Sequence, residues 1–279
     1  MRDKTIVITG ATSGIGAVAA RRLAEQGARI VLIARDPARA QEALRTLRSA
    51  NPEERHRAHF ADLSLVAEMK RVAAEIAAAE PRIDVLLNNA GLIASRHEKS
   101  GDGLELMFAT NHLSYFVITN LLLDRLRAAA PDARIVSTAS EAHRGQSLDM
   151  AGPPNLTGWH GYRASKLCNI LFTRELARRI HGTGVTANCL HPGFIATRFG
   201  DTARGPLRAG IGLAKRLFAR SPEQGARTLV YLASSPEVAG RSGGYYLRGA
   251  PAEPSRQAQN DEDARRLWEL SVRISGVGG

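Results

Sequence analysis

Short apolar segments alternate with longer stretches whose apolar residues recur at helical spacing, and this alternation continues along almost the whole chain. Brief runs rich in Val, Ile and Leu are typical of buried strands, and the amphipathic stretches between them are typical of helices. Strands and helices that alternate in this way form a parallel sheet covered on both faces. The strands expected from the pattern are residues 5–9, 30–33, 57–60, 83–87, 134–138, 185–190 and 243–247.

The pattern therefore predicts an α/β fold, a doubly wound parallel sheet of about seven strands with helices on both faces. We expect one domain spanning residues 1–279. Ser64 is suited to cap a helix that ends near residue 79, and Ser221 before Pro222 predicts a capped helix start. The other expected helices are 38–50, 104–128, 162–180, 222–233 and 261–273, and the substrate loops are 92–101, 141–161 and 194–221.

A glycine-rich turn follows the first apolar run and precedes an alanine-rich helical stretch. Such a turn lets the backbone approach a ligand and directs the first N–H groups of the helix toward it, which suits a pyrophosphate. The spacing Gly-x-x-x-Gly-x-Gly differs from the common dinucleotide fingerprint, and the alternative is that the glycines serve only close packing. The candidate cofactor-binding residues of the turn are Gly10, Thr12, Ser13, Gly14, Ile15 and Gly16.

Composition adds little that is unusual, with 44% apolar and 23% charged residues over 279 positions. The sequence contains no run of about 20 apolar residues and begins without the features of a signal peptide, so we expect a cytoplasmic protein without a membrane span. Cys168 and Cys189 lack metal-ligand spacing. They are expected to be buried, reduced thiols, and no metal site is expected.

The formal charge of +11 invites a nucleic-acid-binding interpretation. The arginines are instead spread over nearly every expected helix without interleaved aromatic residues, which favours solvated helix faces and no nucleic-acid partner. Residues 202–221 differ, because Arg and Lys alternate there with Leu, Ile and Phe and no acid intervenes after Asp201. This segment predicts a basic amphipathic helix that could contact a membrane surface or an anionic ligand.

Polar residues that could hold the adenosine half of a dinucleotide follow the second and third strands. An acid at the end of the second strand would accept a hydrogen bond from a ribose 2′-hydroxyl, whereas an arginine would pair with a 2′-phosphate. Arg35 and Asp36 both stand there, and Arg35 is favoured because it comes first. The alternative is that they begin a solvated helix. After the third strand, Asp62 beside Leu63 suits the adenine amino group, or is simply a turn acid.

The fourth strand ends in two amides followed by small residues, Asn88-Asn89-Ala90-Gly91. Such a run allows the backbone to pass close to a flat ring, although Asn-Asn is also ordinary turn chemistry. Its place at the carboxyl end of a strand favours the ligand-binding interpretation for Asn89, Ala90 and Gly91.

The clearest chemistry lies in Tyr162 and Lys166, which are four residues apart and so share one helix face. A nearby ammonium would lower the tyrosine pKa from about 10 and make it a usable general acid or base. Alone, the pair could be a surface feature. Ser140, just past the fifth strand, could hold a substrate oxygen beside the phenol. Asn111 is the fourth candidate, or marks a helix bend or cap.

Taken together, these residues resemble the short-chain dehydrogenase/reductase family, of the single-domain type, over nearly the full chain. The resemblance rests on Thr9-Gly-x-x-x-Gly14-Ile-Gly16, Asp62, Asn88-Asn-Ala-Gly91, Asn111, Ser140, Tyr162-x-x-x-Lys166 and His191-Pro-Gly193. It implies that Tyr162 exchanges a proton with the substrate oxygen and Ser140 orients that oxygen. Lys166 would lower the tyrosine pKa and hold the nicotinamide ribose, and Asn111 would sustain a water-linked proton relay. Further cofactor contacts are expected at Pro192, Gly193 and Thr197.

A narrower similarity to the retinol dehydrogenase branch rests on Asp102-Gly-Leu-Glu-Leu106, Asn111-His-Leu113, Glu141-Ala-His143 and Leu171-Phe-Thr-Arg-Glu-Leu176. It implies hydride transfer between NADP(H), with NAD as second choice, and a hydrophobic aldehyde, ketone or alcohol. Ala139 replaces a serine common in the family, and Ser13 replaces a basic residue, so the NADP preference depends on Arg35. The alternative function is a catalytically silent NAD(P)-binding sensor or scaffold.

The family resemblance also bears on assembly. Many members pair their long helices across a two-fold axis, so a homodimer or homotetramer through 104–128 and 162–180 is one expectation. The other is that the apolar faces of these helices are covered within a single chain.

Overall fold

The computed structural model describes residues 1–149, 151–193 and 221–278. Within them one sheet of eight strands has the order β3-β2-β1-β4-β5-β6-β7-β8. Strands β1 to β7 are parallel to their neighbours, which confirms the doubly wound fold, and β8 pairs antiparallel with β7. The strands are β1 (Thr5–Thr9), β2 (Arg29–Ala34), β3 (Arg57–Phe60), β4 (Val85–Asn88), β5 (Ala133–Thr138), β6 (Val185–His191), β7 (Tyr245–Leu247) and β8 (Ala250–Ala252).

Strand β8 was missed by the sequence pattern. It has three residues with Pro251 at its centre. A proline within a short apolar run argues against a strand, and it is tolerated here because β8 lies at the edge of the sheet, where one side of its backbone needs no partner.

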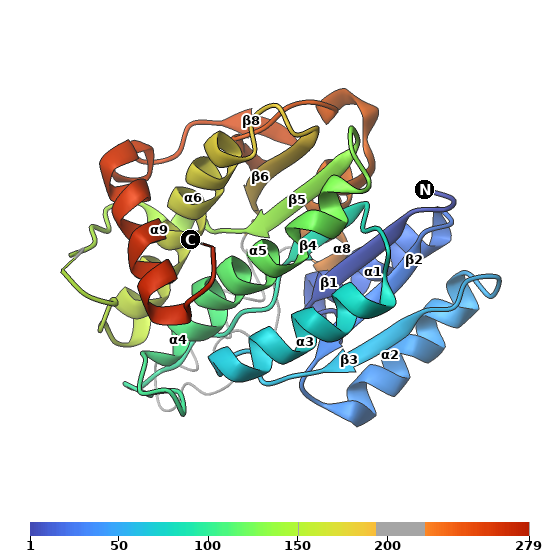
Figure 1. Cartoon of the computed structure of the whole chain (residues 1–279), viewed down its shortest axis with the longest axis horizontal. Coiled ribbons are helices and arrows are strands. Elements are labelled where there is room, and N and C mark those ends of the chain that lie inside the picture. Colours follow the sequence, from blue (N-terminus) through green and yellow to red (C-terminus); the bar gives the residue numbers. More distant parts are fainter. Residues whose placement is uncertain (150, 194–220, 279) are drawn as a thin grey trace.

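Two layers of helices cover the sheet, and together with it they form two apolar cores (Figure 1). Side chains alternate between the faces along a strand, so Val7 enters one core and Ile6 and Ile8 enter the other. Helices α3, α5, α6 and α9 contribute to the first core and α1, α2 and α8 to the second. The helices are α1 (Gly14–Glu25), α2 (Pro37–Ala50), α3 (Val66–Ala79), α4 (Leu106–Phe108), α5 (Ser114–Arg127), α6 (Gly158–Arg179), α8 (Pro222–Ser234) and α9 (Asp261–Ser275).

Three local expectations need correction. The helix expected at 104–128 consists of α4, a π-helical turn η1 (Ala109–Leu113) and α5, and α6 begins at Gly158, within the expected loop 141–161. Ser64 does not cap α3, because its hydroxyl donates to Asp62 Oδ1 at 2.8 Å. The N–H of Val66 instead donates to a carboxylate oxygen of Asp102 at 2.7 Å. A cap supplied from 36 residues away leaves no local sequence signal.

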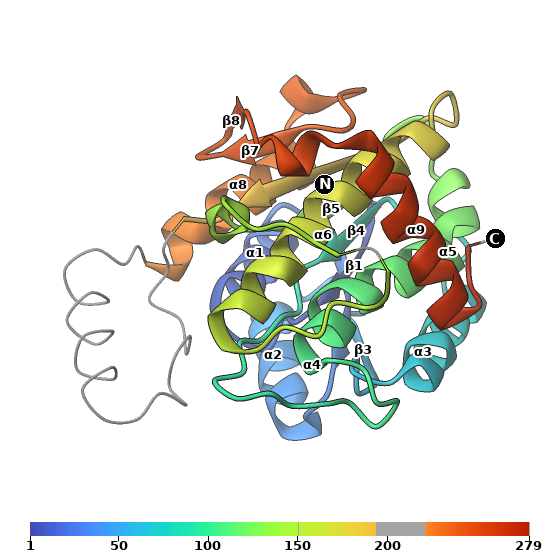
Figure 2. The ribbon, with the colours of Figure 1, turned by 90° about the vertical axis from the view of Figure 1, so that its left-hand side faces the viewer.

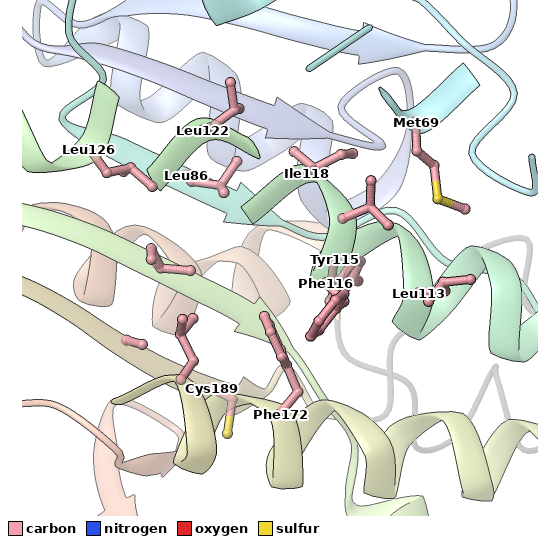
Figure 3. Packing of buried hydrophobic residues seen from close by; sticks show 14 of the residues in the cluster. Met69, Leu86, Leu113, Tyr115, Phe116, Ile118, Leu122, Leu126, Phe172 and Cys189 are labelled. Atoms are coloured by element: carbon pink, nitrogen blue, oxygen red, sulfur yellow. The ribbon is translucent and has the colours of Figure 1, made fainter. Parts of the chain in front are cut away.

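Helix α9 packs along α6 within the chain and reaches α5 through Trp268 (Figure 1). Trp268 of α9 stacks on Phe172 of α6, with ring centroids 6.0 Å apart, and packs edge-on against Phe116 of α5 at 4.8 Å. Figure 3 shows Phe116 and Phe172 meeting inside this core. The continuous helix Leu106–Arg127 is long and apolar enough to cross a membrane, yet 72% of its most apolar window is buried in the fold. It therefore packs as a core helix.

Candidate active site

The carboxyl ends of β1 and β4 lie side by side at the point where the strand order reverses, because the chain runs outward from β1 to β2 and β3 and returns to β4. Open parallel sheets bind ligands in the crevice at such a point. Figure 2 looks onto this edge, where α4 and the start of α6 lie in front of the strands. Most of the candidate residues follow strand ends there.

Asn89 ties the glycine turn to the end of β4. Its side-chain amide nitrogen donates to the carbonyl oxygens of Thr9 at 3.2 Å and Gly10 at 3.1 Å. The hydroxyl of Thr9 accepts from the backbone N–H groups of Asn89 and Ala90, each at 2.9 Å. The side chain of Asn89 thus shapes the turn, and Ala90 is held next to it.

The glycines of the turn do allow close packing. A Cβ atom on Gly10 would lie 2.7 Å from Ala90 Cα, and one on Gly16 would lie 2.3 Å from the carbonyl oxygen of Gly10. Gly10 and Gly14 also have positive φ angles of 70° and 57°. Because the first backbone bond of the helix runs from Ala17 N to the Ser13 oxygen, the N–H groups of the preceding residues lack acceptors within the helix. The turn therefore fits a pyrophosphate as well as close packing.

The two charged residues that follow β2, Arg35 and Asp36, have different surroundings. Asp36 caps α2, accepting from the N–H groups of Ala38 at 2.9 Å and Arg39 at 3.2 Å. Arg35 is exposed beside it. Arg39, which the sequence analysis missed, lines a cavity of about 170 Å³ between the turn and α2 together with Thr12. The available signal was its place in the first turn of the helix that follows Arg35 and Asp36.

Asp62 follows β3 and forms a local turn. Its Oδ1 atom accepts from the backbone N–H of Ser64 at 3.0 Å as well as from the serine hydroxyl. This is the turn chemistry given as the alternative above. Leu63 is buried in the core next to it. A contact of Asp62 with an adenine stays a prediction.

Lys166 and Tyr162 lie on the same face of α6, as predicted. The lysine Nζ atom is 5.6 Å from the centroid of the Tyr162 ring and donates to the carbonyl oxygen of Thr138 at 2.9 Å. Burial lowers the pKa of Lys166 to about 7. A Cβ atom on Gly91 would lie 3.6 Å from Nζ, so the end of the β4 loop passes directly beside the lysine.

Tyr162 is partly buried, and its phenol is bonded to Ser140. Burial raises the pKa of Tyr162 to about 12, and the hydrogen bond with the Ser140 side chain lowers it in part. The expectation of a lowered pKa is therefore not met, because loss of hydration outweighs the serine bond and the lysine is itself largely desolvated. Ser140 lies just past β5, and its hydroxyl also accepts from Ala142 N at 3.1 Å.

Asn111 sits inside the π-helical turn η1 and is completely buried. Its Oδ1 atom accepts from the N–H of Leu92 at 2.8 Å, and its Nδ2 atom donates to the Leu92 oxygen at 2.9 Å and to Ser165 Oγ at 3.0 Å. The bend given as the alternative interpretation is present, and π-turns of this kind are common at functional sites. Asn111 thereby joins the β4 loop to α6 next to the lysine.

Two further residues lie beside the candidates: Asn169, which was not found from the sequence, and Trp159, which belongs to the expected substrate loop 141–161. The side-chain amide nitrogen of Asn169 donates to the same Thr138 oxygen as Lys166, at 3.1 Å. Trp159, 51% exposed, stacks on Tyr162 with ring centroids 5.6 Å apart. Asn169 lies one helical turn after Lys166, and only that spacing could have indicated it.

The last predicted cofactor segment follows β6. Pro192 and Gly193 stand directly after this strand, and Gly193 has a φ angle of 94°. Thr197 and nearly all of the segments 194–221 and 202–221 lie outside the described residues. The roles assigned to the site residues remain predictions.

Comparison with known proteins places the chain in a family. A family model described as short chain dehydrogenase matches residues 4–206. Human "Retinol dehydrogenase 14" is 39% identical over 99% of this chain and 88% of its own length. Human "Retinol dehydrogenase 13" is 37% identical over 98% of this chain and 85% of its own length.

Solved structures agree with the sequence relatives. An uncharacterized protein from Mycobacterium Paratuberculosis superposes with a TM-score of 0.77 and 30% identity, covering 99% of this chain and 94% of that one. A Pseudomonas aeruginosa RhlG/NADP active-site complex has a TM-score of 0.71 and 25% identity, covering 92% of this chain and 96% of that one. The chain therefore belongs to the short-chain dehydrogenase/reductase family, within its retinol dehydrogenase-like branch, and is an oxidoreductase acting on CH–OH groups with a nicotinamide cofactor.

Proposed function

We propose that the protein transfers a hydride between NADP(H) and a hydrophobic aldehyde, ketone or alcohol, with Tyr162 as general acid and base. The observation that carries this proposal is the convergence of Ser140, Tyr162 and Lys166 at one strand edge, with the phenol bonded to the serine. The glycine turn at the same edge fits a pyrophosphate, because its helix start presents N–H groups.

In the reduction direction Tyr162 donates its phenolic proton to the carbonyl oxygen of the substrate. The raised pKa keeps the phenol protonated at neutral pH, which suits this role. Ser140 donates a hydrogen bond to the same oxygen and holds it against the phenol. The cofactor, when bound, supplies the hydride. Lys166 and Asn111 would hold the nicotinamide part of the cofactor in the crevice. Both side chains are buried, so water is excluded around them.

An apolar substrate is supported by Trp159. Its indole is half exposed and covers the Tyr162 ring, so a substrate that reaches the phenol passes an aromatic surface. The similar human proteins are named retinol dehydrogenases, and retinol is a hydrophobic alcohol.

Preference for NADP over NAD is supported by the division of roles after β2. The carboxylate of Asp36 is engaged by the N-terminus of α2 and by Arg39, whose Nε lies 3.4 Å from it. Arg35 is exposed, and Arg39 lines the cavity next to the glycine turn. Two guanidinium groups favour a 2′-phosphate, whereas a carboxylate that already serves as a helix cap is less suited to a ribose hydroxyl.

The test is NADPH oxidation by the purified protein with a panel of apolar aldehydes and ketones, followed by NADPH absorbance. The Tyr162→Phe variant should lose about 100-fold to 10,000-fold in kcat, because a general acid contributes roughly that factor. It should still bind NADPH, as measured by fluorescence. Tyr231→Phe on α8 is the matched control, since that hydroxyl bonds to Glu237.

Two outcomes would count against the proposal. Undiminished turnover in Tyr162→Phe would remove the assigned acid. Binding of NADPH by the parent protein without turnover of any substrate in the panel would favour the silent sensor of the same fold.

A further inference from the structure

The position of Ser140 depends on the short helical turn that follows it, η2 (Glu141–His143). Ser140 is the residue before the turn, and its hydroxyl accepts from Ala142 N at 3.1 Å. The carbonyl oxygen of Ser140 accepts from the backbone N–H of His143 at 3.1 Å. Anything that holds the turn therefore also orients the serine.

The ring of His143 is completely buried and bonded at both nitrogens. Its Nδ1 atom lies 2.6 Å from the carbonyl oxygen of Ser140, and its Nε2 atom lies 3.0 Å from the backbone nitrogen of Ser255. The carbonyl can only accept a hydrogen bond and the amide can only donate one, so these two partners require a neutral ring with its proton on Nδ1. The imidazole thus links the turn to Ser255, which lies 112 positions after His143 in the chain.

Further contacts tie the same turn to the C-terminal part of the chain. The hydroxyl of Tyr245 on β7 donates to Glu141 Oε1 at 2.5 Å, and its ring packs edge-on against His143 with centroids 5.5 Å apart. Arg144 bonds Glu141 at 2.7 Å and donates to the carbonyl oxygen of Glu253 at 2.8 Å.

The other side of the turn is held by α6. Arg163, next to Tyr162 in the chain, donates to the carbonyl oxygens of Ala142 at 3.2 Å and Arg144 at 2.6 Å. The turn therefore lies between the helix that carries the phenol and the segment that follows β8.

We propose that His143 is a positioning residue, which holds the Ser140 hydroxyl in register with Tyr162 by anchoring the serine carbonyl to the backbone of Ser255. The proposal rests on the proposed function only in that Ser140 and Tyr162 act on one substrate oxygen. The segment 253–256, which is remote in sequence from the site residues, thereby helps to hold Ser140 in place through its hydrogen bond to His143.

The surroundings of the ring keep it neutral. Burial and the Arg144 guanidinium lower the pKa of His143, whereas the Ser140 carbonyl and the Glu141 carboxylate raise it, and the net direction is downward. Tyr245 and the backbone of Glu253 complete the groups around the turn. A second proton on Nε2 would leave the N–H of Ser255 without its acceptor.

Two substitutions separate the two bonds of the ring. The amide of His143→Asn reaches about as far as Nδ1 and can still donate to the Ser140 oxygen, while the Ser255 bond is lost. The amide of His143→Gln reaches about as far as Nε2 and can still accept from Ser255, while the Ser140 bond is lost. Exposed His181→Gln is the matched control.

The serine–phenol bond is followed without turnover by NMR of protein labelled at tyrosine ¹³Cζ, with Tyr162→Phe used for assignment. We expect His143→Gln to move the Tyr162 resonance in the same direction as Ser140→Ala does, and His143→Asn to move it less. In kinetics, His143→Gln should lower kcat by up to about 100-fold, the cost of a displacement of about 1 Å in a reacting group, with KM for NADPH nearly unchanged. The oxidation pH profile should shift to higher pH, because the serine bond lowers the pKa of Tyr162.

An unchanged Tyr162 resonance in a folded His143→Gln variant would overturn the proposal. Equal decreases of kcat in His143→Gln and His143→Asn that parallel their losses of thermal stability would also overturn it. Because the NMR arm needs no substrate, a shifted resonance in a chain that turns over no carbonyl compound would contradict the proposed function and leave the positioning of Ser140 supported.

Discussion

The Nζ atom of Lys166 donates a hydrogen bond to the carbonyl oxygen of Thr138, 2.9 Å away at the end of β5. The same oxygen accepts from Asn169 Nδ2 at 3.1 Å. The candidate catalytic lysine is therefore fixed by a backbone group of the sheet and supported by a neutral neighbour one helical turn later. It is also nearly completely buried, at 4% exposure.

Replacing Lys166 by methionine should stabilise the cofactor-free chain at low pH. The folded pKa is about 7 and the ordinary value 10.5, so the unfolded chain binds more protons between these values and stability rises with pH through this window. Below pH 7 the buried charge costs most, and Lys166→Met should gain a few kcal/mol there, while the Thr138 oxygen keeps its bond from Asn169. Urea unfolding at about pH 6 and about pH 10 measures this. A variant less stable than the parent at the lower pH would contradict it.

Removing the Ser140 hydroxyl should raise the pKa of Tyr162 still further. Burial raises this pKa to about 12 and the serine bond opposes the rise, so Ser140→Ala removes the opposing interaction. The phenolate of Tyr162 should then be less populated at about pH 11, where ¹³Cζ-tyrosine NMR can follow it. Ser137→Ala on β5 is the neighbouring control. A lower pKa in Ser140→Ala would show that the bond acts in the opposite sense.

Arg35→Ala and Arg39→Ala should each weaken NADPH binding with little effect on NADH. Loss of a charge-assisted bond to a phosphate costs roughly 1.5–3 kcal/mol, or about 10-fold to 100-fold in affinity. Fluorescence titration with both cofactors measures the ratio. Arg45→Ala, farther along α2 and exposed, is the control. Equal affinities of the parent for NADPH and NADH would refute the 2′-phosphate assignment.

The two tryptophans should differ sharply in their effect on stability. Trp268 is 5% exposed, contacts Phe116 and Phe172, and lies 4.4 Å from the guanidinium carbon of Arg179. Trp268→Ala should therefore cost about 3–5 kcal/mol of unfolding free energy.

Trp159→Ala serves as the matched control, because its ring is 51% exposed and should contribute little to stability. Chemical denaturation of both variants gives the comparison. A loss of unfolding free energy in Trp268→Ala as small as that in Trp159→Ala would mean that α9 contributes little to the stability of the core.

Local patterns were sufficient for much of the fold. Most of the parallel strands were predicted because burial on both sheet faces requires apolar runs, whereas β3, which is Arg-Ala-His-Phe and not buried, gave only a weak signal. The side-chain spacing of a helix placed Tyr162 and Lys166 on one face. Strand β8 and the cap of α3 were missed, because a three-residue edge strand and a carboxylate 36 residues away have no local periodicity.

The sequence by itself determined which chemical groups follow the strand ends, because spacing and residue type are local properties. Only the tertiary structure decided the pKa values of these groups and the hydrogen bonds that hold them in place. Burial reversed the expected shift of the Tyr162 pKa and lowered that of Lys166, since hydration depends on everything packed around a group. The links of Thr9 to Asn89 and of His143 to Ser255 join residues 80 and 112 positions apart. Such contacts exist only once the sheet has brought the strand ends together.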